Sequence, residues 1–290
     1  MAKILITGGT GLVGTRLTQL LTDRKHEVRI LTRNPDAKNE YKWDVSKRYI
    51  DVKALENIDY IIHLAGAGIA DKRWTEDRKK IIIDSRVETA NLLFQKVKEN
   101  KIPLKGFISA SGSNFYGAKT TTDIYTESDN AGKDFLGDVC VKWEQAAHQF
   151  SELQIPVTIL RTGIVLSKTG GALEKMKTPI ISPLGSGNQY MAWIHIDDLC
   201  GIYIKAVEEE LAGVYNTVAP EYHTSKTFSK ILASVIKRPF LPLPVPGFLL
   251  KLIFGELAII LLEGSRLSSK KISDNYQFKY ANLKEALQNL

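Results

Sequence analysis

Short apolar runs alternate with longer amphipathic stretches through the first half of the chain. Runs rich in Ile, Leu and Val predict strands at residues 3–7, 27–32, 59–64, 106–111 and 156–161, with a weaker candidate at 41–45. Between the strands, apolar residues recur at intervals of three and four, which predicts helices that include 75–100 and 134–153. This alternation favours an α/β fold whose parallel strands form a doubly wound sheet.

The pattern changes after about residue 167. A glycine-containing loop leads to further elements, which we expect at 189–194, 197–210, 213–219, 227–236, 276–280 and 283–290. Neither a repeat nor a low-complexity linker separates the two halves. We therefore predict a dinucleotide-binding domain over 1–220, in which 168–188 contributes to the substrate lobe, and a small C-terminal lobe over 221–290.

One later stretch, residues 240–262, is apolar enough and long enough to raise the question of a membrane span. It contains Pro242, Pro244, Pro246, Lys251 and Glu256, which a spanning helix disfavours. We interpret it as a proline-rich lead-in to an amphipathic helix, and expect no membrane partner.

The loop after the first strand reads Thr7-Gly8-Gly9-Thr10-Gly11-Leu12-Val13-Gly14. Glycines at this spacing permit a tight turn, the close approach of a pyrophosphate, and packing of the next helix on the strand. The helix N-terminus then presents unpaired N–H groups to the phosphates. Because the loop lies between a strand and an amphipathic helix, it predicts a Rossmann-type dinucleotide site.

The end of the second strand carries the cofactor preference. An NAD site places an acid about 20 residues past the glycine loop, to bind the ribose 2′-hydroxyl. Here the stretch reads Leu31-Thr32-Arg33-Asn34, without an acid. Since Arg33 can bind a 2′-phosphate that an acid would repel, NADP (NADPH) is the expected cofactor.

Composition excludes several other classes. The 39 Lys and Arg exceed the 32 Asp and Glu by seven, but the positive charges are dispersed and form no nucleic-acid-binding array. Two cysteines cannot form a disulfide framework, and no Cys/His cluster has metal-site spacing. We expect a cytoplasmic protein with a small-molecule substrate, no metal and no nucleic-acid partner, and the sequence leaves a homodimer open.

The predicted helix 75–100 carries an arginine on its apolar face. Residues Ile82, Arg86, Thr89, Leu93 and Val97 form a single stripe. An inward-facing guanidinium needs an anionic partner, because an unpaired buried charge is costly. That partner is either a protein carboxylate or a bound cofactor or substrate.

The chain resembles the extended short-chain dehydrogenase/reductases, and more closely an atypical, epimerase-like family with its own C-terminal segment. The resemblance rests on the glycine loop and on His63-Leu64-Ala65-Gly66, Asp84-Ser85-Arg86, Ser109-Ala110-Ser111, Phe115-Tyr116-Gly117, Trp143-Glu144, Gly185-Ser186-Gly187 and Trp193-Ile194-His195-Ile196-Asp197-Asp198. These matches run through almost the whole chain, although they are looser after residue 264.

Ordinary members of the superfamily use a Tyr and a Lys one helical turn apart, and this pair is missing here. The two positions before Trp143-Glu144 hold Leu136 and Cys140. The atypical family shows the same departure, with Cys for Lys, Arg for a helical Asn, and the Ser retained. The resemblance therefore implies Ser111 and Arg86 as candidate catalytic residues, with Ser109 and Ser113 as alternatives for the hydroxyl. Tyr116, five residues past Ser111, is a further candidate because it is near enough along the chain to reach the site.

The resemblance also assigns the remaining candidate residues. It places Leu64, Ala65 and Gly66 against the adenosine part of the cofactor, and Cys140 beside the nicotinamide ribose. Gln189 and the loop before it correspond to a substrate-contacting segment. His195 and Asp198 are interpreted as structural, with Asp198 expected to cap the following helix.

Two functions stay open from the sequence. The first is an NADP-dependent enzyme, an epimerase-like oxidoreductase acting on a small hydroxyl- or carbonyl-bearing substrate, such as a nucleotide sugar. The second is an NADP(H)-binding sensor or partner-binding protein without turnover. Loss of the Tyr and Lys pair favours the second, whereas Ser111, the inward Arg86 and a full substrate lobe favour the first.

Overall fold

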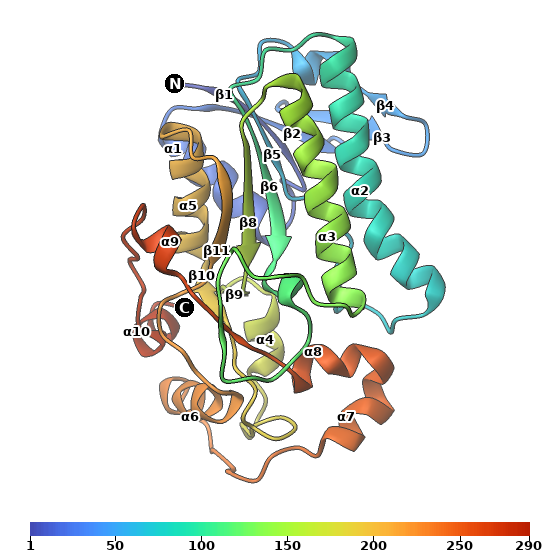
Figure 1. Ribbon diagram of the computed structural model, residues 1–290. Helices are drawn as coiled ribbons and strands as arrows, with labels where there is room; N and C mark the ends of the chain where they lie inside the picture. The colour runs from blue at the N-terminus through green and yellow to red at the C-terminus, as the bar shows by residue number, and fades with distance from the viewer.

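The computed structural model describes residues 1–290, and an eight-stranded sheet lies at its centre (Figure 1). The spatial order is β11-β8-β6-β5-β1-β2-β3-β4. The strands are β1 (Lys3–Thr7), β2 (Glu27–Thr32), β3 (Glu40–Asp44), β4 (Tyr49–Ile50), β5 (Tyr60–His63), β6 (Gly106–Gly112), β8 (Val157–Thr162) and β11 (Gly213–Thr217). All neighbours are parallel except β3 and β4, which confirms the predicted doubly wound sheet.

Two helices cover each face of the sheet. Helices α1 (Leu12–Asp23) and α5 (Ile196–Glu208) lie on one face, and α2 (Glu76–Glu99) and α3 (Phe135–His148) lie on the other (Figure 1). Each pair encloses its own apolar core, because the strands of a doubly wound sheet are buried on both sides. The short 3-10 helices η1 (Val52–Leu55) and η2 (Ser113–Tyr116) connect strands to the following elements.

The helix predicted over 134–153 changes form near its end. The α-helix stops at His148, and residues Gln149–Leu153 continue as the 3-10 helix η3. Gln154 then takes a left-handed conformation, with φ of 60°. A tighter last turn of this kind is common at helix ends and leaves no sequence pattern of its own.

Short elements make up the rest of the molecule; most of them form the lower lobe in Figure 1, whereas α9 (Lys270–Ser273) lies beside α5 and packs on β11. The elements are α4 (Ala172–Met176), α6 (Ser225–Val235), α7 (Gly247–Phe254), η4 (Gly255–Ala258), α8 (Ile259–Leu262), α9 (Lys270–Ser273) and α10 (Leu283–Gln288), with the strand pairs β9 (Ile164–Leu166)–β10 (Trp193–His195) and β7 (Ile124–Tyr125)–β12 (Arg266–Leu267). A third core, around Trp193, Phe228 and Leu283, joins elements from both sides of residue 220.

The apolar stretch 240–262 forms several short helices instead of one. Gly255, with φ of 63°, ends α7, and η4 and α8 follow. Only glycine adopts this backbone conformation without strain, so the chain turns there. None of the helices combines the length and the hydropathy needed to cross a bilayer.

The strand expected at 276–280 is absent. Its alternating aromatic residues pack individually, with Tyr276 and Phe278 against the core of the α1/α5 face. Asp198 accepts hydrogen bonds from the backbone N–H groups of Lys279 (2.7 Å) and Tyr280 (2.9 Å) and from the Tyr276 hydroxyl (3.1 Å). A side chain therefore takes the place of a neighbouring strand.

Candidate functional site

The loop between β1 and α1 has the shape that a dinucleotide requires. Gly8 has φ of 70°, and a Cβ there would lie 2.9 Å from the carbonyl carbon of Leu64. A Cβ on Gly14 would lie 2.3 Å from the Gly8 oxygen, so both positions exclude a side chain. Helix α1 has no side-chain cap and no acid in its first turn. Its first N–H groups, beginning at Leu12 and Val13, are therefore left for an anionic ligand.

Arg33 follows β2 at the same edge of the sheet as the glycine loop, because parallel strands end on the same side. Its side chain is exposed and takes part in no ion pair or hydrogen bond. Thr32 closes the strand and accepts a bond from Asn34 N–H at 3.4 Å. Arg33 is thus a free cation at the place expected for a 2′-phosphate.

The end of β5 is fixed by a buried histidine. His63 Nδ1 lies 2.8 Å from Thr7 Oγ1, and Thr7 Oγ1 accepts a bond from Ala65 N–H at 3.2 Å. Burial lowers the pKa of His63 to about 4, so the ring is neutral at pH 7. These bonds hold Leu64, Ala65 and Gly66 beside the glycine loop. The family resemblance had assigned the same three residues to the adenosine side of the cofactor site.

Arg86 is buried, as its stripe predicts, yet it has no carboxylate partner. Only 8% of the residue is exposed. Its Nη1 donates to the carbonyl oxygens of Ala67 (3.0 Å) and Ile82 (2.8 Å), while its Nε is buried without any partner. The guanidinium lies 4.8 Å from the Trp143 ring, and burial lowers its pKa to about 10. An unsatisfied buried donor on a cation indicates a place for an anionic or oxygen-rich ligand.

Cys140 lies at the opposite wall of the same region. Its thiol donates to the Gly112 carbonyl at 3.7 Å, and burial raises its pKa to about 11. The positive charge of Arg86 offsets only part of this rise. At neutral pH the thiol therefore stays protonated and acts as a small packing residue.

Ser111 and Tyr116 belong to one buried polar network, which the sequence did not reveal. Ser111 Oγ donates to Glu144 at 2.7 Å, and Arg161 binds both oxygens of that carboxylate at 2.8 Å. Arg161 also donates to the Tyr116 hydroxyl at 3.0 Å, which in turn donates to Asn216 at 2.7 Å. The network links β6, η2, α3, β8 and β11 at the carboxyl edge of the sheet.

The same network engages the hydroxyl protons of Ser111 and Tyr116. The Ser111 proton is bound by Glu144 and the Tyr116 proton by Asn216, and both side chains are buried. Burial raises the pKa of Tyr116 to about 12, so the phenol is neutral at pH 7. The alternatives differ: Ser109 donates to the Ala110 carbonyl at 2.9 Å and is buried, whereas Ser113 is partly exposed.

The segment His195-Ile196-Asp197-Asp198 is structural. His195 Nδ1 accepts a bond from Asp197 N–H at 3.1 Å and so caps α5, a role expected for Asp198. Asp197 instead forms a two-bond ion pair with Arg16 of α1, at 2.7 and 3.1 Å. The expected Asp198 cap is wrong because that carboxylate is used by the C-terminal segment.

Gln189, expected from the resemblance to adjoin substrate, has a packing role in the structure. It is buried, and its amide donates to the carbonyls of Leu184 (2.9 Å) and Leu261 (2.7 Å). The preceding loop turns at Gly185 and Gly187, with φ of 61° and 74°. These bonds join the loop to α8.

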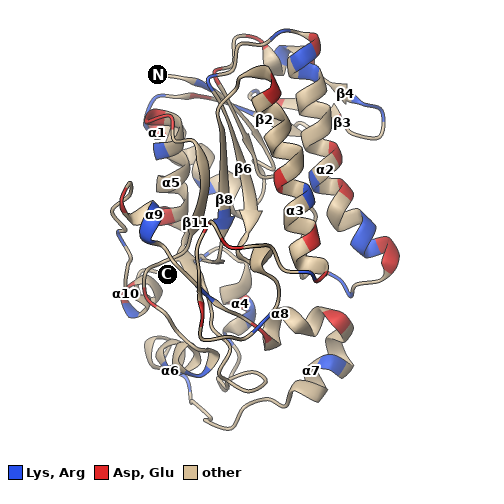
Figure 2. Cartoon of the chain, viewed as in Figure 1, with Lys and Arg blue, Asp and Glu red and all other residues tan.

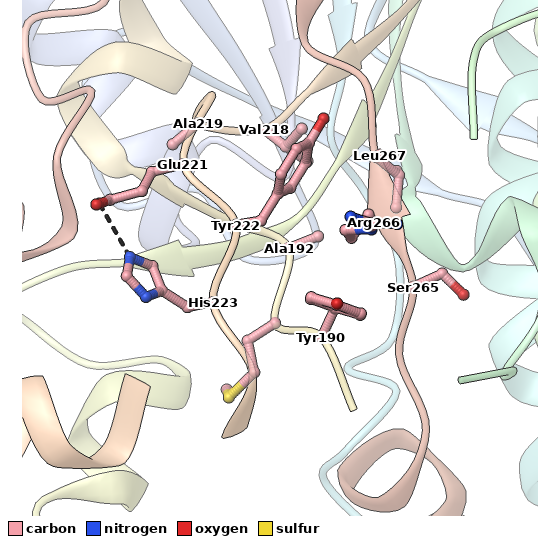
Figure 3. Close-up of a pocket in the computed structure, with 11 residues that line it drawn as sticks. Tyr190, Ala192, Val218, Ala219, Glu221, Tyr222, His223, Ser265, Arg266 and Leu267 are labelled. Carbon is pink, nitrogen blue, oxygen red and sulfur yellow. Dashed lines mark ion pairs between the residues drawn. The ribbon is translucent and has the colours of Figure 1, made fainter. Parts of the chain in front are cut away.

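Arg266 lines a small pocket just past the carboxyl end of β11 (Figure 3). Its guanidinium lies between two aromatic rings, 5.1 Å from Tyr190 and 5.7 Å from Tyr222. The side chain forms no ion pair or hydrogen bond, and its Nε is buried without a partner. Glu221, on the same wall, points to His223 instead (Figure 3). Sequence similarity was weak here, so only the unsatisfied guanidinium identifies this residue.

The structure thus brings Gly66, Arg86, Gly112 and Cys140 together between β5, β6 and the helices α2 and α3. A Cβ on Gly66 would lie 3.0 Å from the Arg86 guanidinium carbon, and one on Gly112 would lie 3.4 Å from the Cys140 sulfur. Ser111 adjoins this group, while Tyr116 connects to it only through Arg161 and Glu144.

Comparisons with known families cover both halves of the chain. A profile of the NAD dependent epimerase/dehydratase family matches residues 4–218, and a profile of a domain of unknown function, DUF1731, matches residues 245–290. An epimerase family protein of Staphylococcus aureus is 36% identical over 306 residues, which span 100% of this chain and 99% of the relative.

Two solved structures are also similar. The crystal structure of the human epimerase family protein SDR39U1 (isoform 2) with NADPH aligns with a TM-score of 0.88 and 32% identity, over 99% of this chain and 98% of that chain. A nucleoside-diphosphate sugar epimerase of Corynebacterium glutamicum aligns with a TM-score of 0.79 and 30% identity, over 99% of this chain and 57% of the other.

Proposed function

The chain belongs to the NAD-dependent epimerase/dehydratase family, and from this premise we propose that it is an NADPH-binding, epimerase-like oxidoreductase. Its substrate would be a small hydroxyl- or carbonyl-bearing molecule, with a nucleotide sugar as the leading class. The observation that carries the proposal is a pair of anion-binding features at one edge of the sheet. They are the free N–H groups at the uncapped start of α1 and the unpaired side chain of Arg33. The human relative, which was crystallised with NADPH, supports the cofactor.

The chain offers a continuous set of cofactor contacts. Backbone N–H groups at Leu12 and Val13 would hold the pyrophosphate beside Gly11, whose own N–H closes the turn onto the Gly8 carbonyl, and Arg33 beside Thr32 would hold the 2′-phosphate. Gly8 and Gly14 allow the close approach, and Leu64, Ala65 and Gly66 line the next strand end. When bound, the nicotinamide supplies hydride-transfer chemistry.

The proposed catalytic group consists of Arg86, Ser111 and Tyr116, and each has a different chemical role. The free donors of Arg86 would bind an anionic group or stabilise charge that develops on a reacting oxygen. Ser111 would hydrogen-bond the reacting oxygen once its hydroxyl turns from Glu144. Tyr116 is the proposed proton donor, once its hydroxyl turns from Asn216. Cys140 would wall the nicotinamide ribose as a neutral side chain.

On the substrate side, Arg266 would bind an anionic part of the substrate. A half-buried guanidinium between Tyr190 and Tyr222 offers five donors and meets no acceptor of the protein. The pocket lies at the carboxyl edge of the sheet, where doubly wound folds bind ligands. Because Cys140 and Cys200 are free thiols, a reducing, cytoplasmic compartment is proposed.

Thermal unfolding with NADPH and with NADH tests the cofactor. Ligand at 100 times its Kd should stabilise the protein by ~2.7 kcal/mol, and we expect this for NADPH at much lower concentration than for NADH. Arg33→Asp should remove the preference, whereas Lys284→Asp, the same charge change on α10, should leave it. Equal shifts from the two cofactors in the wild type would reject the preference for NADP over NAD.

Turnover is tested separately. NADPH oxidation should be followed over a panel of nucleotide sugars and small carbonyl compounds, with Arg86→Met and Arg266→Met as variants. We expect both variants to lower turnover, and only Arg86→Met to weaken NADPH binding. Tight NADPH binding with no turnover across the panel would favour the alternative, a cofactor-binding sensor.

A further inference from the structure

A patch of exposed apolar side chains lies on the lower lobe, away from the sheet. The molecule has 13 large apolar residues that are exposed, and seven of them are Ile180, Leu241, Leu243, Phe248, Leu249, Leu252 and Ile253. The other six belong to other parts of the chain: Met1, Tyr49, Val52, Ile81, Ile124 and Tyr222. Single exposed apolar residues are normal in proteins, but a contiguous group marks a surface that binds something.

Helix α7 provides the main part of this patch. Phe248 and Leu252 are one helical turn apart, and Leu249 and Ile253 are the next such pair, so the four form one continuous face. Phe248 and Leu252 are 69% and 73% exposed, whereas Leu250, on the opposite side of the helix, is buried. Helix α7 is one of the short helices that replace the single amphipathic helix expected from the sequence, and its apolar face is turned toward solvent.

The rest of the protein fixes α7 in this orientation. Arg73 donates to the Leu252 carbonyl at 3.2 Å, and Lys79 of α2 pairs with Glu256 at 2.7 Å. The segment that leads into α7 is paired with the loop near Ile181, since Leu241 N–H donates to the Ile181 carbonyl at 2.9 Å. The outward face therefore follows from contacts at both ends of the segment.

The charged side chains within the segment that carries the patch are all basic. Residues 222–255 contain five basic residues and no acid. The basic residues are Lys226, Lys230, Lys237, Arg238 and Lys251, and all are exposed. Figure 2 shows α6 and α7 in tan and blue, and Glu256 follows α7 in the next element, η4. Lys251 is itself on α7, beside the apolar face.

From these features we propose that the segment 237–253 docks on an anionic lipid surface, with the apolar face of α7 inserted at the headgroup level. A helix with a projecting apolar face and flanking cations is suited to a flat, fluid, negatively charged layer. A second copy of the chain would place the same basic segment against itself, which repulsion opposes. The eight-residue α7 is too short to span a bilayer, so the contact is interfacial. This surface was not expected from the sequence, which suggested no membrane partner.

Vesicle flotation with the full-length protein tests the proposal. The probes are vesicles of phosphatidylcholine alone and of an equal mixture of phosphatidylcholine and phosphatidylglycerol. We expect binding to the mixture only, and a decrease in that binding when salt screens the charges. Phe248→Ser with Leu252→Ser should lower the partition coefficient by about tenfold for each side chain removed.

Two further variants separate the apolar and the charge contributions. Ile81→Ser removes an exposed apolar residue from α2 and should not change binding, while Lys237→Glu with Lys251→Glu should weaken binding to the anionic vesicles. Gel filtration with the same variants monitors folding and assembly. No flotation with the mixture, equal flotation with both vesicles, or a wild-type dimer that Phe248→Ser with Leu252→Ser converts to a monomer would each overturn the proposal.

Discussion

Two arginines are buried to a similar extent but have very different hydrogen-bond partners. Arg161 is 4% exposed and is saturated by Glu144 and Tyr116, whereas Arg86 is 8% exposed and meets only carbonyl oxygens and the Trp143 ring. The two side chains are therefore similarly buried, but only Arg161 has partners for its hydrogen-bond donors and its charge. A buried cation with a complete set of partners joins elements of the fold, and one with a spare, desolvated donor indicates a ligand.

The largest loss of stability should come from breaking the buried network around Arg161. Glu144→Gln leaves Arg161 with an uncompensated buried charge, which we expect to lower the free energy of unfolding by about 3–5 kcal/mol. Urea denaturation measures it. Glu99→Gln, in an exposed pair with Lys96, is the matched control and should change little. The double variant Glu144→Leu with Arg161→Leu should recover stability; if it is no better than Glu144→Gln, the network is not held by charge.

The Arg86 region should show a pH dependence, since His63 lies 3.3 Å from the Arg86 carbonyl. The pKa of His63 is about 4 in the folded chain against 6.5 unfolded, so the unfolded chain binds the proton more tightly between these values. Stability is then complete above about pH 6.5 and falls as pH decreases toward 4, by about 3 kcal/mol.

Unfolding of His63→Gln over this pH range is the measurement, with the exposed His148→Gln as control. The decrease should become smaller in His63→Gln and stay in His148→Gln. Part of it should remain, because burial also lowers the pKa of His195. An unchanged pH profile in His63→Gln would show that the ring is not the titrating group.

Changing Arg86 should separate ligand binding from stability. Arg86→Met removes two hydrogen bonds to carbonyls but also a costly buried charge, so the loss of stability should be smaller than for Glu144→Gln. NADPH affinity should fall by about 10- to 100-fold, as measured by titration calorimetry. A variant as unstable as Glu144→Gln that binds NADPH normally would make Arg86 another structural arginine.

The smallest effect is expected at Cys140. Its pKa of about 11 leaves almost no thiolate at pH 7, so iodoacetamide should modify it only slowly in the folded protein and faster after denaturation. Cys140→Ala should change the free energy of unfolding by about 1 kcal/mol. Fast modification in the folded protein that Arg86→Met abolishes would instead mean that Arg86 activates the thiol.

Patterns that repeat locally were predictable from the sequence. The ends of β1 and β2 agree with the predicted residues, because each strand is an apolar run closed by a polar loop. The inward face of α2 was also predictable, since a stripe of five residues needs only helical periodicity. The glycine loop and Arg33 follow from their distance along the chain.

Contacts between distant segments could not be predicted in this way. Nothing in the sequence pairs Glu144 with Arg161 or leaves Arg266 unpaired, because both depend on which strands become neighbours. The failed strand at 276–280 has the same cause: Asp198, 81 residues away from Lys279 in the chain, takes the hydrogen bonds that a strand would need.

The last residues of the chain also affect how the protein folds. Ile272 is fully buried in the core between α1, α5 and the sheet, and Asp198 ties the next turns to the start of α5. The two matched family segments therefore share a hydrophobic core. Residues 245–290 contribute to the core on one face of the sheet. The line between the two sequence families therefore does not divide two cooperative folding units, and the chain should unfold in a single transition.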